Sequence, residues 1–284
     1  MKLIPVETPQ DFLAAQQFIA PYEETCVSLA SLVRRKSDKL VFLVSSDETV
    51  VEWPRSGCIE TTGLLGIINL DSTLYHCIPD PSQLEADFLK AQLPYFLKKP
   101  VRCISGEKNA TDFLIKIFPD PAQTYDYKMM NLPRSPASPE LSGGEEIIRC
   151  TEHDMEALHQ LQKDYMKEEV FVPGRKISDA EVDISLRQIL KNQLCFALTV
   201  DGDIVAKANT NAIGINCVQI GGVYTHPLYR RSGYAGALVQ ALCNRALRSG
   251  KQPVLFVKEK NTPAFNLYQK LGFEECGRYT IAYY

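Results

Sequence analysis

The stretch that decides the fold reads V-Y-T-H-P-L-Y-R-R-S-G-Y-A-G-A-L and runs from Val223 to Leu238. An apolar strand leads into Pro227, which cannot donate to a sheet ladder and therefore ends the strand. Two arginines and a run of small residues follow, and Leu238, Leu242 and Ala246 recur at helical spacing. A turn with little side-chain bulk at the start of a helix leaves backbone N–H groups exposed beside the positive end of the helix dipole. The stretch therefore predicts an anion site, and the guanidinium groups suit phosphate or pyrophosphate.

A second informative segment, L-F-V-K-E-K-N-T-P-A-F-N-L-Y-Q-K-L-G-F, runs from residue 255 to 273. It predicts a buried strand over 254–257, a polar turn, and then a helix. Asn261 or Thr262 would open this helix, with Pro263 at its first position. Gly272 is a natural C-cap, so the helix should end just before it.

Together the two segments resemble the GNAT N-acetyltransferase superfamily, whose members use acetyl-CoA. The phosphate-loop pattern of that family, Gln/Arg-x-x-Gly-x-Gly/Ala, is matched by Arg230, Gly233 and Ala235. Its later pattern is matched by a second set of residues, Asn261, Ala264, Tyr268, Gly272 and Phe273. The resemblance covers roughly residues 146 to 284. Taken alone, the first pattern has an alternative interpretation, a helix start that needs small residues only for packing.

The resemblance implies direct attack of a primary amine on the thioester of acetyl-CoA, with CoA as the product. Family members splay the strand before the phosphate turn from its neighbour and use its backbone N–H groups to polarise the thioester carbonyl. These roles fall here on Gly222, Val223, Tyr224 and Thr225. The pyrophosphate would be bound by Arg230, Arg231, Ser232, Gly233, Tyr234, Ala235 and Gly236. Asn261 and Ala264 would complete the cofactor site.

The resemblance also implies a catalytic role for Tyr268, which matches the tyrosine that protonates the departing CoA thiolate. A phenol with an ordinary pKa near 10 suits this role, because the CoA thiolate is only slightly less basic. The alternative is a core aromatic, since the chain contains 13 tyrosines.

The general base is missing from the positions that the family uses. Phe256 stands where several members carry a glutamate, and residues 219–222 hold no acid where others place a carboxylate. Either a chain of water molecules removes the proton or a carboxylate arrives from elsewhere. Glu168 and Glu169 are candidates for this carboxylate and for substrate binding, because the region between the first two helices of the domain lines the acceptor groove in the family, although a solvated helix end explains them equally well. His226 precedes a proline that holds it in an extended turn, and the four histidines show no ligand spacing, so we expect no metal site.

Composition sets limits on the class of protein. Of 284 residues, 45% are apolar and 23% charged, which is typical of a globular chain. A net charge of −3 without a basic run argues against nucleic-acid binding. Nine cysteines without a C-x-x-C pair indicate free thiols in a reducing compartment. Because no secretion signal and no membrane-spanning run is evident, we expect a cytoplasmic protein. A homodimer is compatible with these limits.

The organisation predicted is α/β (α+β), with two GNAT-like modules that each carry a mixed, mostly antiparallel sheet flanked by helices. Residues 131–145, rich in proline, serine and glycine, predict a linker. It separates a degenerate GNAT-like domain at 1–130 from a catalytic domain at 146–284. In the second domain we expect helices over 152–168 and 179–191, and strands over 195–200, 204–209 and 218–224.

The first half resembles a diverged copy of the second. The tripeptide Glu-Lys-Asn occurs at 107–109 and again at 259–261, and Phe113 and Tyr127 find partners at the same offset of 152 in Phe265 and Tyr279. So short a match could arise by chance. Where the phosphate turn should be, the first half offers only P-D-P-S-Q-L-E at 79–85, whose acidic character opposes pyrophosphate binding. We therefore expect that the first half kept the fold and lost the cofactor.

Three hypotheses on function follow. The first is an N-acetyltransferase that acts on a small amine, an amino acid or a peptide amine. The second is a module that binds acyl-CoA as a sensor without turnover, because no general base is evident. The third is an interaction protein whose first half presents a surface to another chain.

Overall fold

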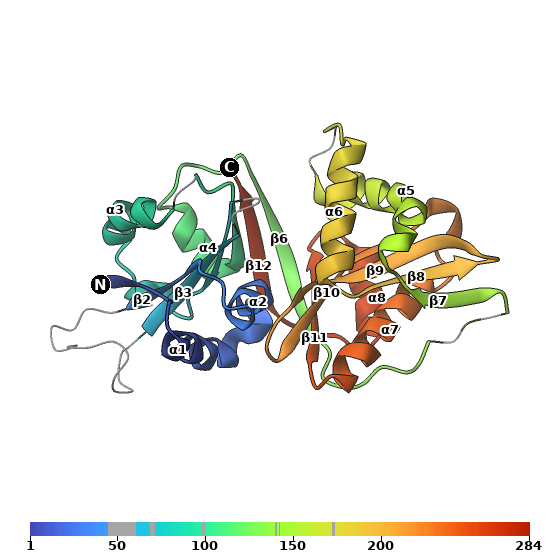
Figure 1. The fold of residues 1–284 in the computed structure, drawn as a ribbon, viewed down its shortest axis with the longest axis horizontal. Helices are drawn as coiled ribbons and strands as arrows, with labels where there is room; N and C mark the ends of the chain where they lie inside the picture. The colour runs from blue at the N-terminus through green and yellow to red at the C-terminus, as the bar shows by residue number, and fades with distance from the viewer. Residues whose placement is uncertain (45–60, 69–71, 98–99, 140, 142, 172–173) are drawn as a thin grey trace.

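The computed structural model describes residues 1–44, 61–68, 72–97, 100–139, 141, 143–171 and 174–284. The first half of the chain combines six strands with four α-helices among the described residues (Figure 1). Its strands are β1 (Lys2–Pro5), β2 (Leu40–Val44), β3 (Thr61–Ile68), β4 (Thr73–Cys77), β5 (Cys103–Glu107) and β6 (Gln123–Asn131). Its helices are α1 (Pro9–Ile19), α2 (Val27–Arg34), α3 (Ala86–Phe96) and α4 (Lys108–Ile115).

The second half has the same order of strands and helices, and its predicted elements lie close to their predicted positions. Two differences are that β9 extends to Ile213, beyond the predicted 204–209, and that β7 was not predicted and begins at the last residue of the predicted linker. The strands are β7 (Glu145–Arg149), β8 (Cys195–Val200), β9 (Asp203–Ile213), β10 (Cys217–Thr225), β11 (Gln252–Lys258) and β12 (Glu274–Tyr283). The helices are α5 (Met155–Tyr165), α6 (Asp179–Asn192), α7 (Tyr234–Arg248) and α8 (Thr262–Lys270), and a π-helical turn (Met166–Val170) extends α5. The helix predicted over 152–168 thus changes its winding in its last turn.

A single sheet of twelve strands connects both halves within the described residues. Its order is β1-β2-β3-β4-β5-β12-β6-β11-β10-β9-β8-β7. Neighbouring strands are antiparallel except for two pairs, β4–β5 and β10–β11, which are parallel. The structure thus confirms the predicted fold class, a mixed and mostly antiparallel sheet flanked by helices.

The two halves exchange their last strands at the centre of this sheet. Strand β12, from the second half, pairs with β5 of the first half, and β6, from the first half, pairs with β11 of the second. The two exchanged strands also pair with each other, so that Tyr127 lies opposite Tyr279. Figure 1 shows both strands crossing the space between the two lobes, with the C-terminus on the side of the first. Sequence reasoning did not anticipate this exchange.

Strand order and direction repeat on either side of the β12–β6 pair. From the outer edge inward, each side has three antiparallel pairings, one parallel pairing, and then an exchanged strand. This symmetry supports the proposed internal duplication. The division at residues 131–145 stays a prediction, and within it residues 140 and 142 lie outside the described ranges.

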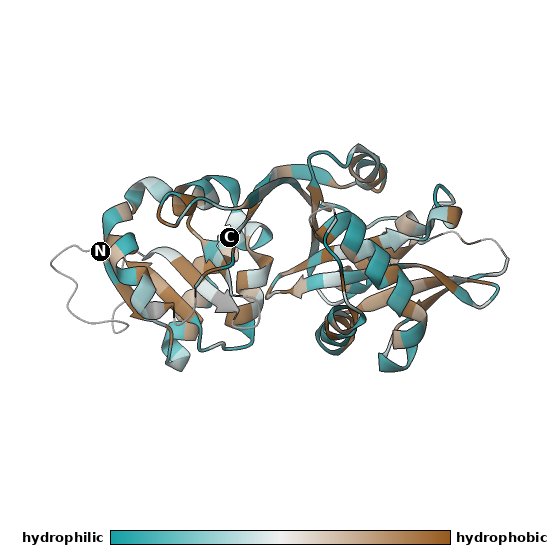
Figure 2. Ribbon diagram, turned by 90° about the horizontal axis from the view of Figure 1, so that it is seen from above, coloured by the Kyte–Doolittle hydropathy of each residue, from teal (hydrophilic) through white to brown (hydrophobic). Residues whose placement is uncertain are grey.

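Helices cover both faces of the sheet in the second half, and the alternation of side chains decides which residue faces which layer. On β8, Leu198 packs into an apolar cluster with α7, whereas its neighbour Ala197 packs into a cluster with α5 and α6. Figure 2 shows apolar residues concentrated along the strands and polar residues on the outer surfaces of the helices.

A buried carboxylate joins the two halves on one face. Glu23, in a 3-10 turn of the first half and only 2% exposed, accepts hydrogen bonds from the backbone N–H groups of Ile215, Asn216 and Cys217 at 2.6 to 2.9 Å. The side-chain amide of Asn216 donates to it as well, at 3.0 Å. Because these donors lie in the β9–β10 turn, this one side chain fixes the start of β10 against the first half.

Candidate functional site

Strand β10 separates from its parallel neighbour halfway along its length. Its register with β11 ends at Ile220, which lies opposite Leu255. On the other side, the register with β9 shifts between Gly221 and Tyr224, which marks a β-bulge. Gly222 has φ +58°, and a Cβ there would lie 1.8 Å from the Asn209 side-chain oxygen. The second half of β10 therefore opens away from β11, and only glycine fits at the bulge.

The chain continues from β10 into the predicted anion site. His226 caps a 3-10 turn, Pro227–Tyr229, and its Nδ1 accepts a hydrogen bond from the Leu228 N–H at 3.4 Å, so it plays a structural part in the turn. Arg231 and Gly233 then have φ values of +69° and +84°. Helix α7 begins directly after Gly233 without a side-chain cap. Its first N–H groups consequently remain available to an anion.

The two arginines of the turn differ in their contacts. Arg230 donates to the Glu168 carboxylate at 2.8 Å and to the Thr225 carbonyl at 3.1 Å. Arg231 is exposed and forms no hydrogen bond or ion pair with any described residue. The free guanidinium beside the start of α7 is thus that of Arg231.

Tyr268 lies on α8, which begins as the sequence predicts. The Asn261 side chain caps the helix by accepting from the Ala264 N–H at 3.2 Å, and Gly272, at φ +91°, follows its end. Tyr268 is 8% exposed and packs edge-on against Phe273. Burial, and then the nearby Tyr165 and Glu169, raise the pKa of Tyr268, so its phenol keeps the proton at neutral pH.

One cavity of about 1720 Å³ brings these features together. The predicted residues that line it are Glu168, Glu169, Gly222, Val223, Tyr224, Thr225, Arg230, Arg231, Gly233, Tyr234, Ala235, Gly236, Asn261, Ala264 and Tyr268. Of the predicted cofactor residues only Ser232 is not among the lining residues. The cavity thus collects the strand, the turn and the helix that the resemblance implies.

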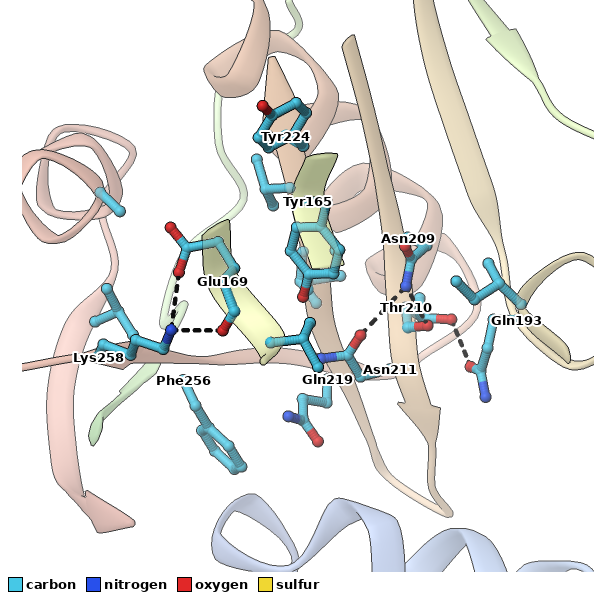
Figure 3. A pocket seen from close by; sticks show the side chains of 18 of the residues that line it. Tyr165, Glu169, Gln193, Asn209, Thr210, Asn211, Gln219, Tyr224, Phe256 and Lys258 are labelled. Carbon is cyan, nitrogen blue, oxygen red and sulfur yellow. Dashed lines mark hydrogen bonds and ion pairs between the residues drawn. The ribbon is translucent and has the colours of Figure 1, made fainter. Parts of the chain in front are cut away.

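Both candidate carboxylates sit in the π-helical turn and are held by neighbours. The Tyr224 hydroxyl donates to Glu168 Oε1 at 2.7 Å, and Arg230 contacts Oε2. Glu169 forms an ion pair with Lys258 at 3.3 Å, and the Asn261 amide donates to it at 3.4 Å. Figure 3 shows Glu169 bonded to Lys258 on one side of Tyr165. The π turn therefore links α5 to β10, the phosphate turn and α8.

Sequence reasoning missed the polar side of the cavity. On β9, Asn209, Thr210 and Asn211 line the cavity, and the buried Lys207 donates to the Asn209 side-chain oxygen at 3.2 Å. The Asn209 amide donates to Asn211 at 3.2 Å, and the Thr210 hydroxyl donates to Gln193 at 2.7 Å (Figure 3). The signal was present in the sequence as the consecutive polar residues Asn209, Thr210 and Asn211, which follow the mostly apolar start of the predicted strand.

In the first half, side chains fill the space between β4 and β5, the parallel pair that matches β10 and β11 in strand order. His76 on β4 is 1% exposed, and its Nε2 lies 2.8 Å from the Thr111 hydroxyl. A Cβ at Gly106 on β5 would lie 2.1 Å from the same ring, so the imidazole packs directly on the neighbouring parallel strand. Asp80 accepts from the Ser82 N–H at 3.0 Å in the segment that replaces the phosphate turn. A buried ring and an acidic cap thus occupy positions where the second half is open.

Comparisons with known proteins support the resemblance. Residues 155–273 match the model of the Acetyltransferase (GNAT) family. A GCN5-related N-acetyltransferase from Sphaerobacter thermophilus has a TM-score of 0.60 at 16% identity, over 99% of this chain and 94% of that one. A GCN5-related N-acetyltransferase from Kribbella flavida has a TM-score of 0.58 at 15% identity, over 90% and 93%. A GNAT-family acetyltransferase from Colwellia psychrerythraea has a TM-score of 0.56 at 11% identity, over 100% of both chains.

At these identities the solved structures show the fold alone, whereas the GNAT family model matches residues 155–273, which lie in the second half. For these residues the match suggests acyl transfer from acetyl-CoA. No curated protein matches the chain.

Two further observations concern the described residues only. None of their helices has the length and apolar character that crossing a membrane requires. Their eight cysteines are free, and seven of these are buried, while Cys58 lies outside the described ranges.

Proposed function

We propose that the second half of the chain is an acetyl-CoA-dependent N-acyltransferase that acetylates a primary amine by direct transfer. One spatial observation carries the proposal. The opening between β10 and β11, the uncapped start of α7, and Tyr268 all border the same cavity. They offer the three functions that thioester transfer needs, which are carbonyl polarisation, phosphate binding and protonation of the leaving group.

The residues present fit acetyl-CoA as a substrate. The first N–H groups of α7 and the unpaired Arg231 suit the pyrophosphate. Backbone groups of Val223 and Tyr224, beyond the end of the β10–β11 register, suit the amides of the pantetheine arm. The buried Thr225 hydroxyl has no hydrogen-bond partner among the described residues, so it is available to a polar group of the bound substrate.

In the proposed reaction the nitrogen lone pair of the amine attacks the thioester carbonyl carbon. Backbone N–H groups of the bulged strand face the carbonyl oxygen, where negative charge develops. The C–S bond breaks, the acetyl group stays on nitrogen, and the thiolate takes a proton. Tyr268 supplies this proton, since burial keeps its phenol protonated at neutral pH. The same burial raises its pKa above the value near 10 at which phenol and thiolate are matched, so the phenol is a weaker acid here than the sequence suggested.

The proton that the amine loses needs an acceptor. We assign this part to Glu169 rather than Glu168. The contacts of Glu169 to Lys258 and Asn261 measure 3.3 and 3.4 Å. Glu168 is held more tightly, because Tyr224 and Arg230 donate to its two oxygens at 2.7 and 2.8 Å. The contacts that Glu169 makes to Lys258 and Asn261 also favour a second candidate function. If the Glu169 carboxylate stays bound to Lys258 and Asn261, it accepts no proton from an amine, and the domain would bind acyl-CoA as a sensor without turnover.

We place the acceptor amine in the groove between the halves. Tyr75 and Tyr127 of the first half, and Tyr279 on the exchanged β12, line the same cavity as Tyr268. Phe256 stacks on Tyr279 with ring centroids 4.2 Å apart. The first half, which we propose is a degenerate GNAT-like domain, would thus form one wall of the acceptor groove.

An assay of CoA release tests the proposal, with a panel of amines, polyamines, amino acids and peptides that have free N-termini. Tyr268→Phe removes only the hydroxyl, and we expect it to lower kcat about a hundredfold with little change in the KM for acetyl-CoA. The matched control is Tyr95→Phe, at a tyrosine on α3 that is 82% exposed, and we expect it to leave both constants unchanged.

Two outcomes would count against the transferase. If calorimetry detects CoA binding but no amine in the panel releases CoA, the sensor is the better description. If CoA does not bind at all, both candidate functions fail. Equal kcat values for Tyr268→Phe and the control would remove Tyr268 from the reaction while leaving the transfer itself in place.

A further inference from the structure

Lys207 is a buried cation without an acidic partner. Its side chain is 0% exposed on β9, the third strand from the β7 edge of the sheet. The ammonium donates to the Gly222 carbonyl at 3.0 Å and to the Asn209 side-chain oxygen at 3.2 Å, and it lies 4.8 Å above the Tyr165 ring. No carboxylate among the described residues forms an ion pair with it. Because burying an uncompensated charge costs free energy, packing alone does not explain a lysine at this position.

The Gly222 carbonyl, which Lys207 holds, belongs to the bulge of β10. The register jumps from Gly221 opposite Asn209 to Tyr224 opposite Lys207, so two residues of β10 lie between these pairs where β9 has one. Since a trans peptide is planar, its C=O and the N–H of the next residue point in opposite directions. Holding the Gly222 carbonyl toward Lys207 therefore fixes the Val223 N–H in the opposite direction. Val223 lines the cavity beyond the end of the β10–β11 register.

The surroundings of Lys207 leave its charge free to act on the bulge. The titratable groups that face it are the Tyr165 phenol on α5, the Cys195 thiol on β8 and the Cys150 thiol just after β7. Burial lowers the pKa of Lys207 to about 8, so the side chain is still mainly protonated at neutral pH. Lys258, which lines the cavity, is paired with Glu169 instead.

We propose that Lys207 is a positioning residue for acyl transfer, one that fixes the peptide between Gly222 and Val223 so that the Val223 N–H is held toward the thioester oxygen. The inference rests on the proposed function, because it needs acetyl-CoA in the opening between β10 and β11. The charge of the Lys207 ammonium lies on the carbonyl side of this peptide and polarises the peptide further, which strengthens the Val223 N–H as a donor.

Infrared difference spectroscopy of bound acetyl-CoA, labelled with ¹³C at the thioester carbonyl, reads this contact without an acceptor amine. In the wild type we expect the carbonyl band below that of free acetyl-CoA, because a hydrogen bond to the oxygen weakens the C=O bond. In Lys207→Met the band should move at least half of the way back to the free position. Lys207→Arg, which keeps a charged donor, should retain most of the shift. With any amine that the release assay identifies, Lys207→Met should lower kcat about tenfold and change the KM for acetyl-CoA much less.

The matched control is Lys251→Met, at a lysine that also donates to backbone carbonyls, those of Gly214 and Ile215, at the opposite end of β10. It should keep the wild-type band and kcat. If Lys207→Met does not fold, as judged by a thermal melt, Lys207→Gln takes its place. A wild-type shift that persists in the folded variant would overturn the role of Lys207 alone. A wild type that does not bind acetyl-CoA, or binds it with an unshifted band, would overturn the proposed function and this inference together.

Discussion

At the scale of single residues, the buried ammonium of Lys207 sets how folding responds to pH. Burial lowers its pKa from the ordinary 10.5 to about 8. Between these pH values the unfolded chain binds a proton that the folded chain has lost, so the free energy of unfolding contributed by this group rises with pH. The rise amounts to about 3 kcal/mol over the window. We expect urea denaturation to show it as the difference between the wild type and Lys207→Met, measured at pH 8 and pH 10.5.

Taking the difference between two proteins cancels the thiols and phenols that lie away from Lys207, because these groups are common to both. The thiols of Cys195 and Cys150 face the lysine, so their change in titration is part of the measured difference. Below pH 8 both states of the chain hold the proton, and the two proteins should show parallel pH dependence. Parallel curves between pH 8 and 10.5 as well would contradict the burial of a charged lysine at this position.

Arg231 offers a second prediction at this scale, because it is the arginine of the turn without a partner. The substitution Arg231→Gln should raise the KM for acetyl-CoA about tenfold, because it removes one charge-assisted hydrogen bond to the substrate, and it should leave kcat nearly unchanged. The control is Arg248→Gln, in the exposed last turn of α7. Initial rates at varied acetyl-CoA concentration check both, and a kcat effect without a KM effect would argue against phosphate binding by Arg231.

At the scale of elements, the bulge of β10 is the feature on which the site depends. Gly222→Ala places a methyl group against Asn209 at a positive φ, so the bulge must shift or the strand must strain. We expect a loss of about 2 kcal/mol in stability and a much larger proportional loss of kcat, because the N–H groups lose their direction. Thermal melts and CoA-release rates on the same samples measure the two effects.

Gly202 provides the matched control for that substitution. It also has a positive φ, +92°, but a Cβ there would meet no atom within 4 Å. Gly202→Ala should therefore cost about 1 kcal/mol of stability for the backbone conformation and leave turnover intact. If both variants lose turnover in proportion to stability, the bulge has no special role.

Local signals explain how much could be predicted from the sequence. Asn261 caps α8, Gly272 follows it in the left-handed region, and Asp201-Gly202 turns between β8 and β9, because each feature depends on residues within one turn of the chain. The cofactor side of the cavity was predictable for the same reason. Non-local features were not, and the position of Lys207 under the bulge depends on the register of β9 against β10, which no single segment encodes.

At the scale of the whole molecule, the exchange of strands makes the two halves depend on each other. Each half supplies the strand that completes the other half of the sheet, and Tyr279 reaches the wall of the cavity only because β12 crosses over. The sequence could not reveal the exchange, because β6 and β12 are similar aromatic strands and either could close either half. In a separated half, β5 would lack β12 or β11 would lack β6, because each of these partners belongs to the other half. Both halves are therefore best studied in the full chain.

The exchange itself can be tested by cutting the chain. A protease site placed between residues 136 and 139, in the segment that joins β6 to β7, allows cleavage of the folded protein. Because β6 stays paired with β11 and β12 with β5, we expect the fragments to elute together in size-exclusion chromatography and to separate only in denaturant. Glu23→Ala leaves buried N–H groups of the β9–β10 turn without an acceptor and should weaken the association of the fragments by about 3 kcal/mol. Fragments of the cut wild type that elute apart in native buffer would show instead that each half closes its own sheet.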